Sequence, residues 1–279
     1  MIVLFYSTQD PAAVHAANAL RDLRPSVKTQ LRGFDAWRFD GAMGSSDGHM
    51  KNEGHAASAS FDLVELPFRA LSFQDADLFN ADLAVFLSRH AGASRRPCFT
   101  CHLTGNFGEP IADFGGQAYT LSKASAHWLK RFYQALNART GRVSLEATHH
   151  GPTLKTPTLF VETGSDESEW IEPENGKLLA ESVLAAIEGQ NPGGKACLGF
   201  GGTHYCSAFA PLLEQGWAMS HVASKHSLES VTKTMLQQAV EKTVEPVEMV
   251  FLDKGGLPST KRKELESWCV DLALPLELL

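Results

Sequence analysis

The chain has 279 residues, 43% of them hydrophobic, and a formal net charge of -7 at pH 7. This length suffices for one large domain, or one domain with a smaller lobe. The negative charge argues against broad electrostatic binding to nucleic acid but leaves room for a local basic patch. Five cysteines without an export signal indicate free thiols and a cytoplasmic protein.

Short apolar runs alternate with helical patterns along the chain. Residues 1–7 (MIVLFYS) predict a first strand rather than a signal peptide, because no basic segment precedes them. Residues 11–23 predict a helix with a proline in its first turn. Residues 41–60 are rich in Gly, Ser and Ala, which indicates a flexible insertion.

The remaining elements continue this alternation. Strands are expected at 82–88, 98–102, 143–147, 157–162, 195–200, 217–222 and 247–252. Helices are expected at 122–139, 175–188, 228–242 and 259–270, the last with Ser259 as its N-cap. Alternating strands and helices predict a single α/β domain over residues 1–279 with a parallel or mixed sheet. No run approaches the length of a membrane-spanning helix.

Six apolar runs end in an imidazole or a carboxylate. These residues are His90, His102, His149 with His150, Glu162, His204 and His221. The ligand site of an open α/β sheet lies outside the carboxyl ends of its strands, so strands running the same way would bring these groups to one edge. Adjacent side chains of a strand face opposite ways. His149 and His150 can therefore serve one site only if Gly151-Pro152 breaks the strand.

Histidine and carboxylate side chains are zinc ligands, and a hydrolytic zinc keeps one position open for water. No local motif such as HExxH is present, so the site would be assembled from distant segments. The alternative is that each histidine only hydrogen-bonds at the end of a strand. For His90, His102 or His221 taken singly, the two interpretations weigh equally. The adjacent pair His149 and His150 favours function, whereas the histidines in helical patterns are expected to be structural.

Three familiar motifs are either incomplete or in the wrong context. Cys98 to His102 match the C-x-x-C-H pattern of haem attachment, but the run predicts a buried strand in a chain without an export signal. The glycines at 199–202 lack the third glycine of a dinucleotide loop, because His204 stands there. A tight turn that presents His204, and that offers N–H groups to an oxyanion, accounts for them better. Ser165 lacks the G-x-S-x-G context of a nucleophile.

Five motifs occur in a fixed order: FLSRH, TCHLTGN, EATHHGPT, FVETGSDESEW and GFGGTHY. Together with the N-terminal strand they resemble the archaeal and plant type of D-aminoacyl-tRNA deacylase over residues 1–254. The resemblance implies a three-layer α/β/α fold with a central mixed sheet of the phosphorylase/hydrolase type. It also implies a zinc-dependent hydrolase that cleaves the ester between a D-amino acid and the 3′ end of tRNA.

The same motifs locate the expected site. The expected ligands of one or two zinc ions are His90, His102, His149, His150, Glu162 and His204. The expected catalytic residues are His150, Glu162 and His204, with Glu162 as general base or ligand and an unligated histidine as proton donor to the ribose. The expected substrate contacts are Arg89, Arg95, Arg96, Gly151, Pro152, Gly201, Gly202 and Tyr205.

Other functions remain open at this point. The main alternative is a zinc-dependent peptidase or amidohydrolase of similar fold that acts on a small amide. A non-catalytic nucleotide-binding protein and a nucleoside-phosphorylase-like enzyme are also compatible with the fold. The expected partner is aminoacyl-tRNA, with no membrane and no obligatory protein partner, for a monomer or small homo-oligomer.

Overall fold

The computed structural model describes residues 1–41, 59–93, 95–111 and 113–279. The flexible insertion expected at 41–60 lies almost entirely outside the described residues. No helix in the described ranges is long and apolar enough to cross a membrane.

The larger sheet has eight strands in the order β2-β3-β4-β1-β5-β10-β6-β9. Its strands are β1 (Ile2–Ser7), β2 (Val27–Leu31), β3 (Phe34–Phe39), β4 (Phe61–Leu66), β5 (Leu83–Ala91), β6 (Cys98–Leu103), β9 (Val143–Leu145) and β10 (Thr158–Ser165). Strands β4, β1, β5 and β10 run parallel, whereas β6 runs antiparallel to β10 and β3 antiparallel to β4. The predicted α/β fold with a central mixed sheet is therefore confirmed.

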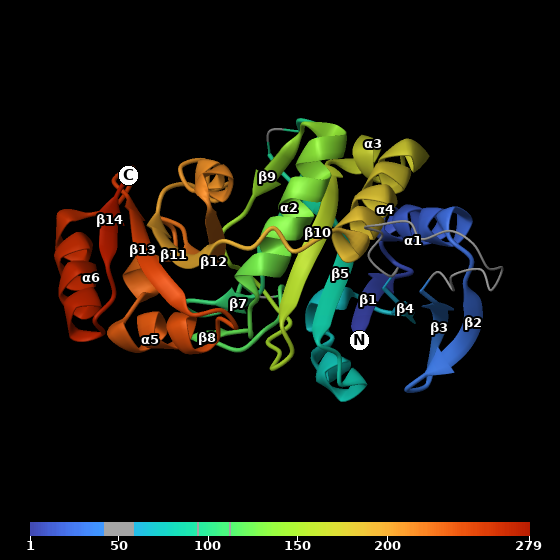
Figure 1. Ribbon diagram of the computed structural model, residues 1–279, viewed down its shortest axis with the longest axis horizontal. Helices are drawn as coiled ribbons and strands as arrows, with labels where there is room; N and C mark the ends of the chain where they lie inside the picture. Colours follow the sequence, from blue (N-terminus) through green and yellow to red (C-terminus); the bar gives the residue numbers. More distant parts are fainter. Residues whose placement is uncertain (42–58, 94, 112) are drawn as a thin grey trace, which may run out of the picture.

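Three of the predicted strands form a second, parallel sheet rather than part of the first. Its order is β12 (Trp217–Ala223), β11 (Lys195–Gly201), β13 (Val247–Asp253) and β14 (Leu276–Leu278). A two-stranded ribbon consists of β7 (Gly105–Asn106) and β8 (Thr120–Leu121). In Figure 1 the second sheet lies at the opposite end of the long axis from β2 and β3.

The helices begin and end at identifiable signals. The α-helices are α1 (Pro11–Leu23), α2 (Ala126–Thr140), α3 (Glu167–Trp170), α4 (Pro173–Glu188), α5 (Lys233–Glu241) and α6 (Ser259–Asp271). The 3-10 helices are η1 (Ala70–Ser72), η2 (Gln74–Phe79), η3 (Ala210–Gln215) and η4 (Leu228–Ser230). Asp10 caps α1 by accepting from the Ala13 N–H. Ser259 is not the N-cap of α6, because Pro258 is the last extended residue and Ser259 is already helical.

Helices α1, α2 and α4 lie across the same side of the larger sheet (Figure 1) and pack their apolar residues against it. The opposite face packs against the region of η1 and η2, where Phe5, Phe86 and Phe160 meet Phe73 and Phe79. The second sheet adds residues to the core beneath α2, and its far face is covered by α5 and α6. Both sheets thus share one continuous core.

Strand register positions the polar groups on one face of the larger sheet. Side chains two residues apart in a strand share a face, so Glu162 lies on the same face as Phe160. His102 pairs with Phe160 across β6 and β10, and His90 pairs with Gly164 across β5 and β10. The expected convergence at the carboxyl ends of parallel strands is wrong for His102, because β6 is antiparallel. The groups meet on the face of the sheet instead.

Candidate active site

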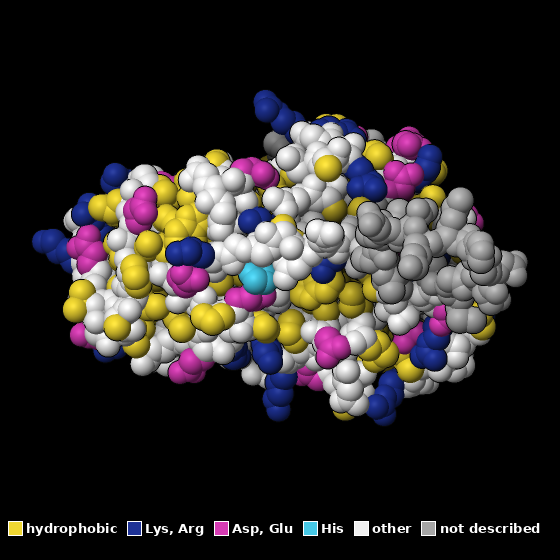
Figure 2. All heavy atoms as spheres, in the orientation of Figure 1, with side chains coloured by type: hydrophobic (Ala, Val, Ile, Leu, Met, Phe, Trp, Pro, Cys, Tyr) yellow, Lys and Arg dark blue, Asp and Glu magenta, His cyan; other side chains and the backbone are white. Residues whose placement is uncertain are grey.

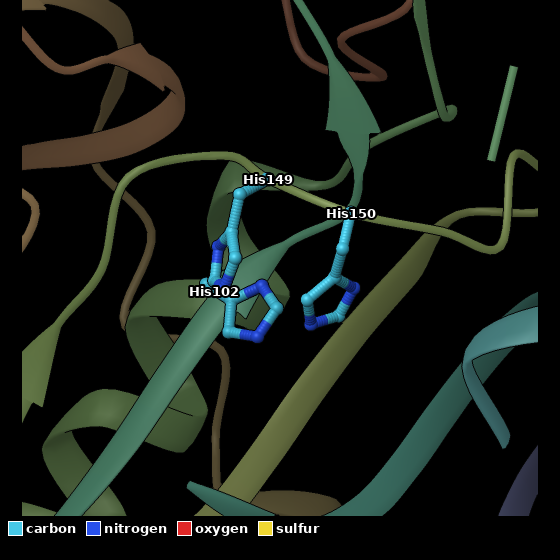
Figure 3. A group of neighbouring side chains, drawn as sticks. All are labelled: His102, His149 and His150. Carbon is cyan, nitrogen blue, oxygen red and sulfur yellow. The ribbon is translucent and has the colours of Figure 1, made fainter. Parts of the chain in front are cut away.

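The six residues expected as metal ligands lie in one buried cluster. They are His90 of β5, His102 of β6, His149 and His150 of the segment after β9, Glu162 of β10 and His204 of the loop after β11. Figure 3 shows three of these rings, with His102 projecting from its strand toward His149 and His150. Four strands of one sheet and a loop of the other therefore supply a single site.

Glu146, which follows β9, lies at the centre of this cluster. It is fully buried, and its Oε1 lies 2.9 Å from Nδ1 of His90. Its Oε2 lies 3.7 Å from Nε2 of His204 and 3.9 Å from Nε2 of His149. Sequence reasoning missed Glu146, although a carboxylate closing an apolar strand was the same signal that identified Glu162.

Glu162 is the second buried carboxylate. Its Oε2 accepts a hydrogen bond of 3.2 Å from Thr100 Oγ1 and lies 3.6 Å from Nε2 of His102. Nδ1 of His90 is 3.7 Å away. The neighbouring Gly164 leaves room for His90, because a Cβ there would lie 2.7 Å from the His90 carbonyl oxygen. The site thus depends on a glycine at this position in β10.

His102, His149 and His150 each use Nδ1 for a hydrogen bond to the main chain and leave Nε2 available. Each donates from Nδ1 to a main-chain carbonyl oxygen, over 3.2, 2.8 and 2.6 Å respectively. The ring centroids are 4.2 to 4.7 Å apart. A neutral imidazole that donates from Nδ1 keeps its lone pair on Nε2, which is the arrangement of metal-ligating histidines.

The segment after β9 explains how two adjacent histidines serve one site. β9 ends at Leu145, and His150 adopts a left-handed conformation with a φ of 46° before a cis Gly151–Pro152 bond. The expected break in the strand is confirmed. The main chain at Leu71 packs closely against Gly151, because a Cβ at Gly151 would lie only 2.8 Å from the Leu71 carbonyl oxygen. Gly151 and Pro152 shape this segment and do not line the cavities described below.

Burial and charge set the protonation states. Burial lowers the pKa of His150 to about 3 and the pKa of His149 well below its ordinary value. Burial raises the pKa of Glu146, but the neighbouring histidines overcome this effect and lower it to about 2. Burial lowers the pKa of His90, but Glu146 and Glu162 overcome this and raise it to about 12. Burial also lowers the pKa of His102, but Glu162 and Glu146 overcome this effect and raise it. The ionised Glu146 and the neutral His149 and His150 are therefore in the forms that bind a divalent cation, whereas His90 is protonated and pairs with the carboxylates.

The donor set fits a metal. His102 Nε2 and both carboxylate oxygens of Glu146 are buried without a hydrogen-bond partner among the described residues. Three groups place their ligand atoms within 4.8 Å of one another: His102, His149 and His150; Glu146, His149 and His204; and His90, Glu146 and Glu162. Because the groups overlap, the cluster fits one ion or two neighbouring ions. Imidazole and carboxylate ligands suit zinc.

Two other expectations gave different outcomes. His221 of β12 does not join the cluster, since its Nε2 donates to the Ser122 carbonyl and its Nδ1 accepts from Thr148 Oγ1. The hydrogen-bonding interpretation therefore applies to His221. Tyr205 does reach the site, where its hydroxyl lies 3.0 Å from Nε2 of His90.

The glycine turn after β11 has a different role from the one expected. The Gly202 N–H donates to the Gly255 carbonyl over 2.9 Å, and a Cβ at Gly201 or Gly202 would meet Asp253. The Gly202 N–H is thus engaged and does not serve an oxyanion. The turn presents His204, whose carbonyl accepts from the Ala147 N–H over 2.8 Å. The glycines bring the turn close to β13 and so fix the position of His204.

A cavity of about 450 Å³ opens onto the cluster; we call it the arginine cavity. Arg69, Arg89 and Trp170 line it together with Glu162 and His204. The Arg89 guanidinium lies 4.9 Å from the Trp170 ring centroid. Arg95 and Arg96, which were expected to contact substrate, lie in the loop between β5 and β6 and do not line this cavity.

The cysteines take no part in the cluster. All five are free, and Cys101 is fully buried in β6 beside His102. The prediction of free thiols is confirmed. Since the His102 ring belongs to the histidine cluster, the haem-type match at Cys98–His102 has no support from the fold.

Fold and site together define a mixed α/β protein with a buried histidine and carboxylate centre suited to a metal. A family model described as D-aminoacyl-tRNA deacylase matches residues 78–277. The D-aminoacyl-tRNA deacylase of Korarchaeum cryptofilum is 32% identical, over 98% of this chain and 91% of its own length. That of Hyperthermus butylicus is 33% identical, over 99% and 100%. The chain belongs to the D-aminoacyl-tRNA deacylase family and is a hydrolase.

A solved structure supports the fold independently. The crystal structure of a protein described as conserved and of unknown function covers 100% of this chain and 95% of its own chain, with a TM-score of 0.84. The two sequences are 24% identical, so this similarity concerns the architecture alone.

Proposed function

We propose that this chain hydrolyses the ester bond of D-aminoacyl-tRNA at the buried cluster, with zinc bound there, and releases the free D-amino acid and tRNA. Family membership supports the reaction. The observation that carries the choice of site is the cluster itself: His102, His149 and His150 place their ligand nitrogens within 4.8 Å of one another, and the buried Glu146 carboxylate lies 3.9 Å from Nε2 of His149.

The residues that would hold zinc are those of the overlapping groups. His102, His149 and His150 form an all-imidazole set, and Glu146 and His204 share His149 with it. Zinc bound there supplies a Lewis acid that lowers the pKa of a water ligand toward about 7 and polarises a carbonyl. The carbonyl acceptors of the three Nδ1 atoms fix the tautomers and ring orientations that such binding needs.

Two residues are proposed to move protons. Glu162 lines the arginine cavity and is placed to accept the proton of the attacking water. The His204 side chain is 36% exposed and borders the same cavity, which suits a donor to the leaving ribose oxygen when zinc occupies the set of His102, His149 and His150 and leaves His204 unligated. His150, also expected to be catalytic, is buried with its Nε2 among the imidazole donors, so its proposed role is to hold metal.

Contact with tRNA is proposed to be local. On the face shown in Figure 2, Lys and Arg side chains are scattered among Asp and Glu rather than gathered in one patch. Arg69 and Arg89 at the arginine cavity are the proposed phosphate contacts. Few phosphates would then be neutralised, and the affinity should fall only gently with salt.

The test is release of amino acid from matched D- and L-tyrosyl-tRNA, using protein stripped with a chelator and then reloaded with zinc or, as a control, magnesium. We expect zinc-dependent hydrolysis of the D-ester with the L-ester spared. Stoichiometric zinc without hydrolysis of either ester would refute the deacylase and favour the zinc-dependent peptidase. Full activity of the stripped protein would refute the metal.

A further inference from the structure

Two cavities border the histidine cluster. A second cavity, of about 510 Å³, also borders the cluster. His149, His150, His204 and Phe114 line both. Phe107 and Tyr119 line only the second one, which we call the aromatic cavity. Reacting groups held at the cluster can therefore extend into either cavity.

The aromatic cavity has the lining of a site for an apolar group. Among the large hydrophobic side chains that are exposed in the described chain, Ile111, Phe114 and Tyr119 all line it. Phe107 contributes a buried ring, and no Lys or Arg stands among the described lining residues. Exposed apolar side chains gathered at a concave surface, with a few hydroxyl groups such as Ser227, are typical of small-molecule sites.

The arginine cavity has the opposite chemistry. Arg69 and Arg89 supply two guanidinium groups, which suit phosphate. Trp170 is held in place because its Nε1 donates to the His90 carbonyl over 2.8 Å, so its ring is a fixed surface for stacking. Cations beside a fixed aromatic ring favour a nucleotide over an amino-acid side chain.

The ester carbonyl of aminoacyl-tRNA is flanked by two different groups. One is the Cα of the amino acid with its side chain, and the other is the oxygen of the terminal ribose. We propose that the aromatic cavity receives the amino-acid side chain and that the arginine cavity receives the terminal nucleotide of tRNA. This inference rests on the proposed function. It implies that Phe107, Phe114 and Tyr119 set the preference for the side chain and favour large apolar ones.

The test compares two substrates, D-tyrosyl-tRNA and D-alanyl-tRNA, which share the terminal nucleotide. Ser227→Phe adds a ring to the wall of the aromatic cavity, and Arg89→Ala removes a cation from the arginine cavity. We expect Ser227→Phe to lower the ratio of kcat/KM for D-tyrosyl over D-alanyl ester by about ten-fold. Arg89→Ala should lower kcat/KM for the D-tyrosyl ester and kcat/KM for the D-alanyl ester by the same factor. Ser267→Phe, on the exposed side of α6, is the matched control and should change neither.

The result that would overturn the inference is an unchanged ratio in Ser227→Phe, or a changed ratio in Arg89→Ala. Failure of the proposed function is distinguishable, because the wild-type protein would then hydrolyse neither ester. If it hydrolyses both while Ser227→Phe leaves the ratio unchanged, only the assignment of the cavities is wrong.

Binding of adenosine 5′-monophosphate provides a readout that does not depend on activity. We expect Arg89→Ala to weaken this binding by at least about five-fold, in line with the loss of one charged contact, and Ser227→Phe to leave it unchanged. Two results would overturn the assignment of the arginine cavity. One is binding that Ser227→Phe weakens and Arg89→Ala leaves unchanged, and the other is no binding of adenosine 5′-monophosphate to the wild-type protein.

Discussion

Glu146 Oε1 and His90 Nδ1 lie 2.9 Å apart. Glu146 directly follows β9 and His90 belongs to β5, and these two strands are separated in the sheet by β6 and β10. Two further side chains, from the strands between β5 and β9, join this pair. Oε2 of Glu162 in β10 lies 3.7 Å from Nδ1 of His90, and Nε2 of His102 in β6 lies 4.0 Å from Oε2 of Glu146. The cluster therefore extends over four adjacent strands, and its integrity depends on the pairing of all four.

Glu146→Gln should abolish most of the activity, because the amide keeps the shape of the side chain but removes the charge shared by four histidines. We expect kcat/KM to fall by about 100-fold or more, equivalent to about 3 kcal/mol, together with a loss of bound zinc. The control is Glu174→Gln on the exposed first turn of α4, which should be neutral. Activity and metal content like those of the wild type would contradict the central role of Glu146.

His149→Ala should weaken zinc binding more than His150→Ala does. His149 belongs to two of the three donor groups, whereas His150 belongs to one. We expect His149→Ala to lower zinc affinity by at least about ten-fold, since even the loss of a partner outside the metal ligands costs that much. Metal content after dialysis against graded zinc buffers measures this. Equal losses, or a larger loss in His150→Ala, would contradict the overlap of the groups.

His221 should make folding stability sensitive to acid. Burial lowers its folded pKa to about 3, below the ordinary value of 6.5. Its contribution is fully present above pH 6.5 and is lost as the pH falls toward 3, by up to about 1.4 kcal/mol per pH unit. His221→Gln should be less stable at pH 7.5 by about 1–3 kcal/mol but should lose less between pH 7 and 5.

This prediction is measured by urea unfolding of chelator-treated wild-type and His221→Gln protein at several pH values. His149 and His150 are present in both proteins, so the difference between the two profiles isolates His221. Parallel profiles would show that His221 is not held neutral in the folded state.

Gly164→Ala should damage the site beyond its effect on stability. The added Cβ would lie 2.7 Å from the His90 carbonyl oxygen and 2.8 Å from the His90 Cβ, so β5 must shift at His90. We expect a loss of stability of about 1–3 kcal/mol and a loss of activity of at least ten-fold at a temperature where the protein is fully folded.

Gly141→Ala is the matched control. Gly141 ends α2 with a φ of 58° and has nothing within 4 Å of an added Cβ. This variant should cost about 1 kcal/mol through backbone strain alone and keep full activity once folded. Equal activities in the two variants would show that room for His90 is not required.

The sequence predicted correctly the helices and strands that a capping residue or a regular apolar pattern marks. Pro11 and apolar residues at helical spacing, such as Ala13, Ala16, Ala17 and Leu20, mark α1, which begins and ends at the predicted residues. The pattern at 228–242 was predicted as one helix, but it divides into η4 and α5, because Thr232 caps α5 by accepting from the Met235 N–H. Strands β2, β3 and β4 of the larger sheet were not predicted, and neither were the short strands β7, β8 and β14.

Physical causes account for the missed strands. β2 is an edge strand without a buried residue, so its sequence VKTQL lacks a regular apolar face and resembles a loop. β4 follows the glycine-rich stretch and forms its pairs with distant residues of β1 and β3. Such pairing is decided by packing of the whole sheet rather than by the local sequence.

The sequence by itself determined the chemistry of this protein: which imidazoles and carboxylates close apolar runs, and that THHGP interrupts a strand. These properties belong to residue type and local conformation, which neighbouring residues specify. Only the tertiary structure decided which groups meet. It brought Glu146 to the centre, turned β6 so that His102 faces Phe160, and directed His221 to a hydrogen-bonded place in the second sheet. Strand direction and sheet order are set by long-range packing, which the local pattern does not encode.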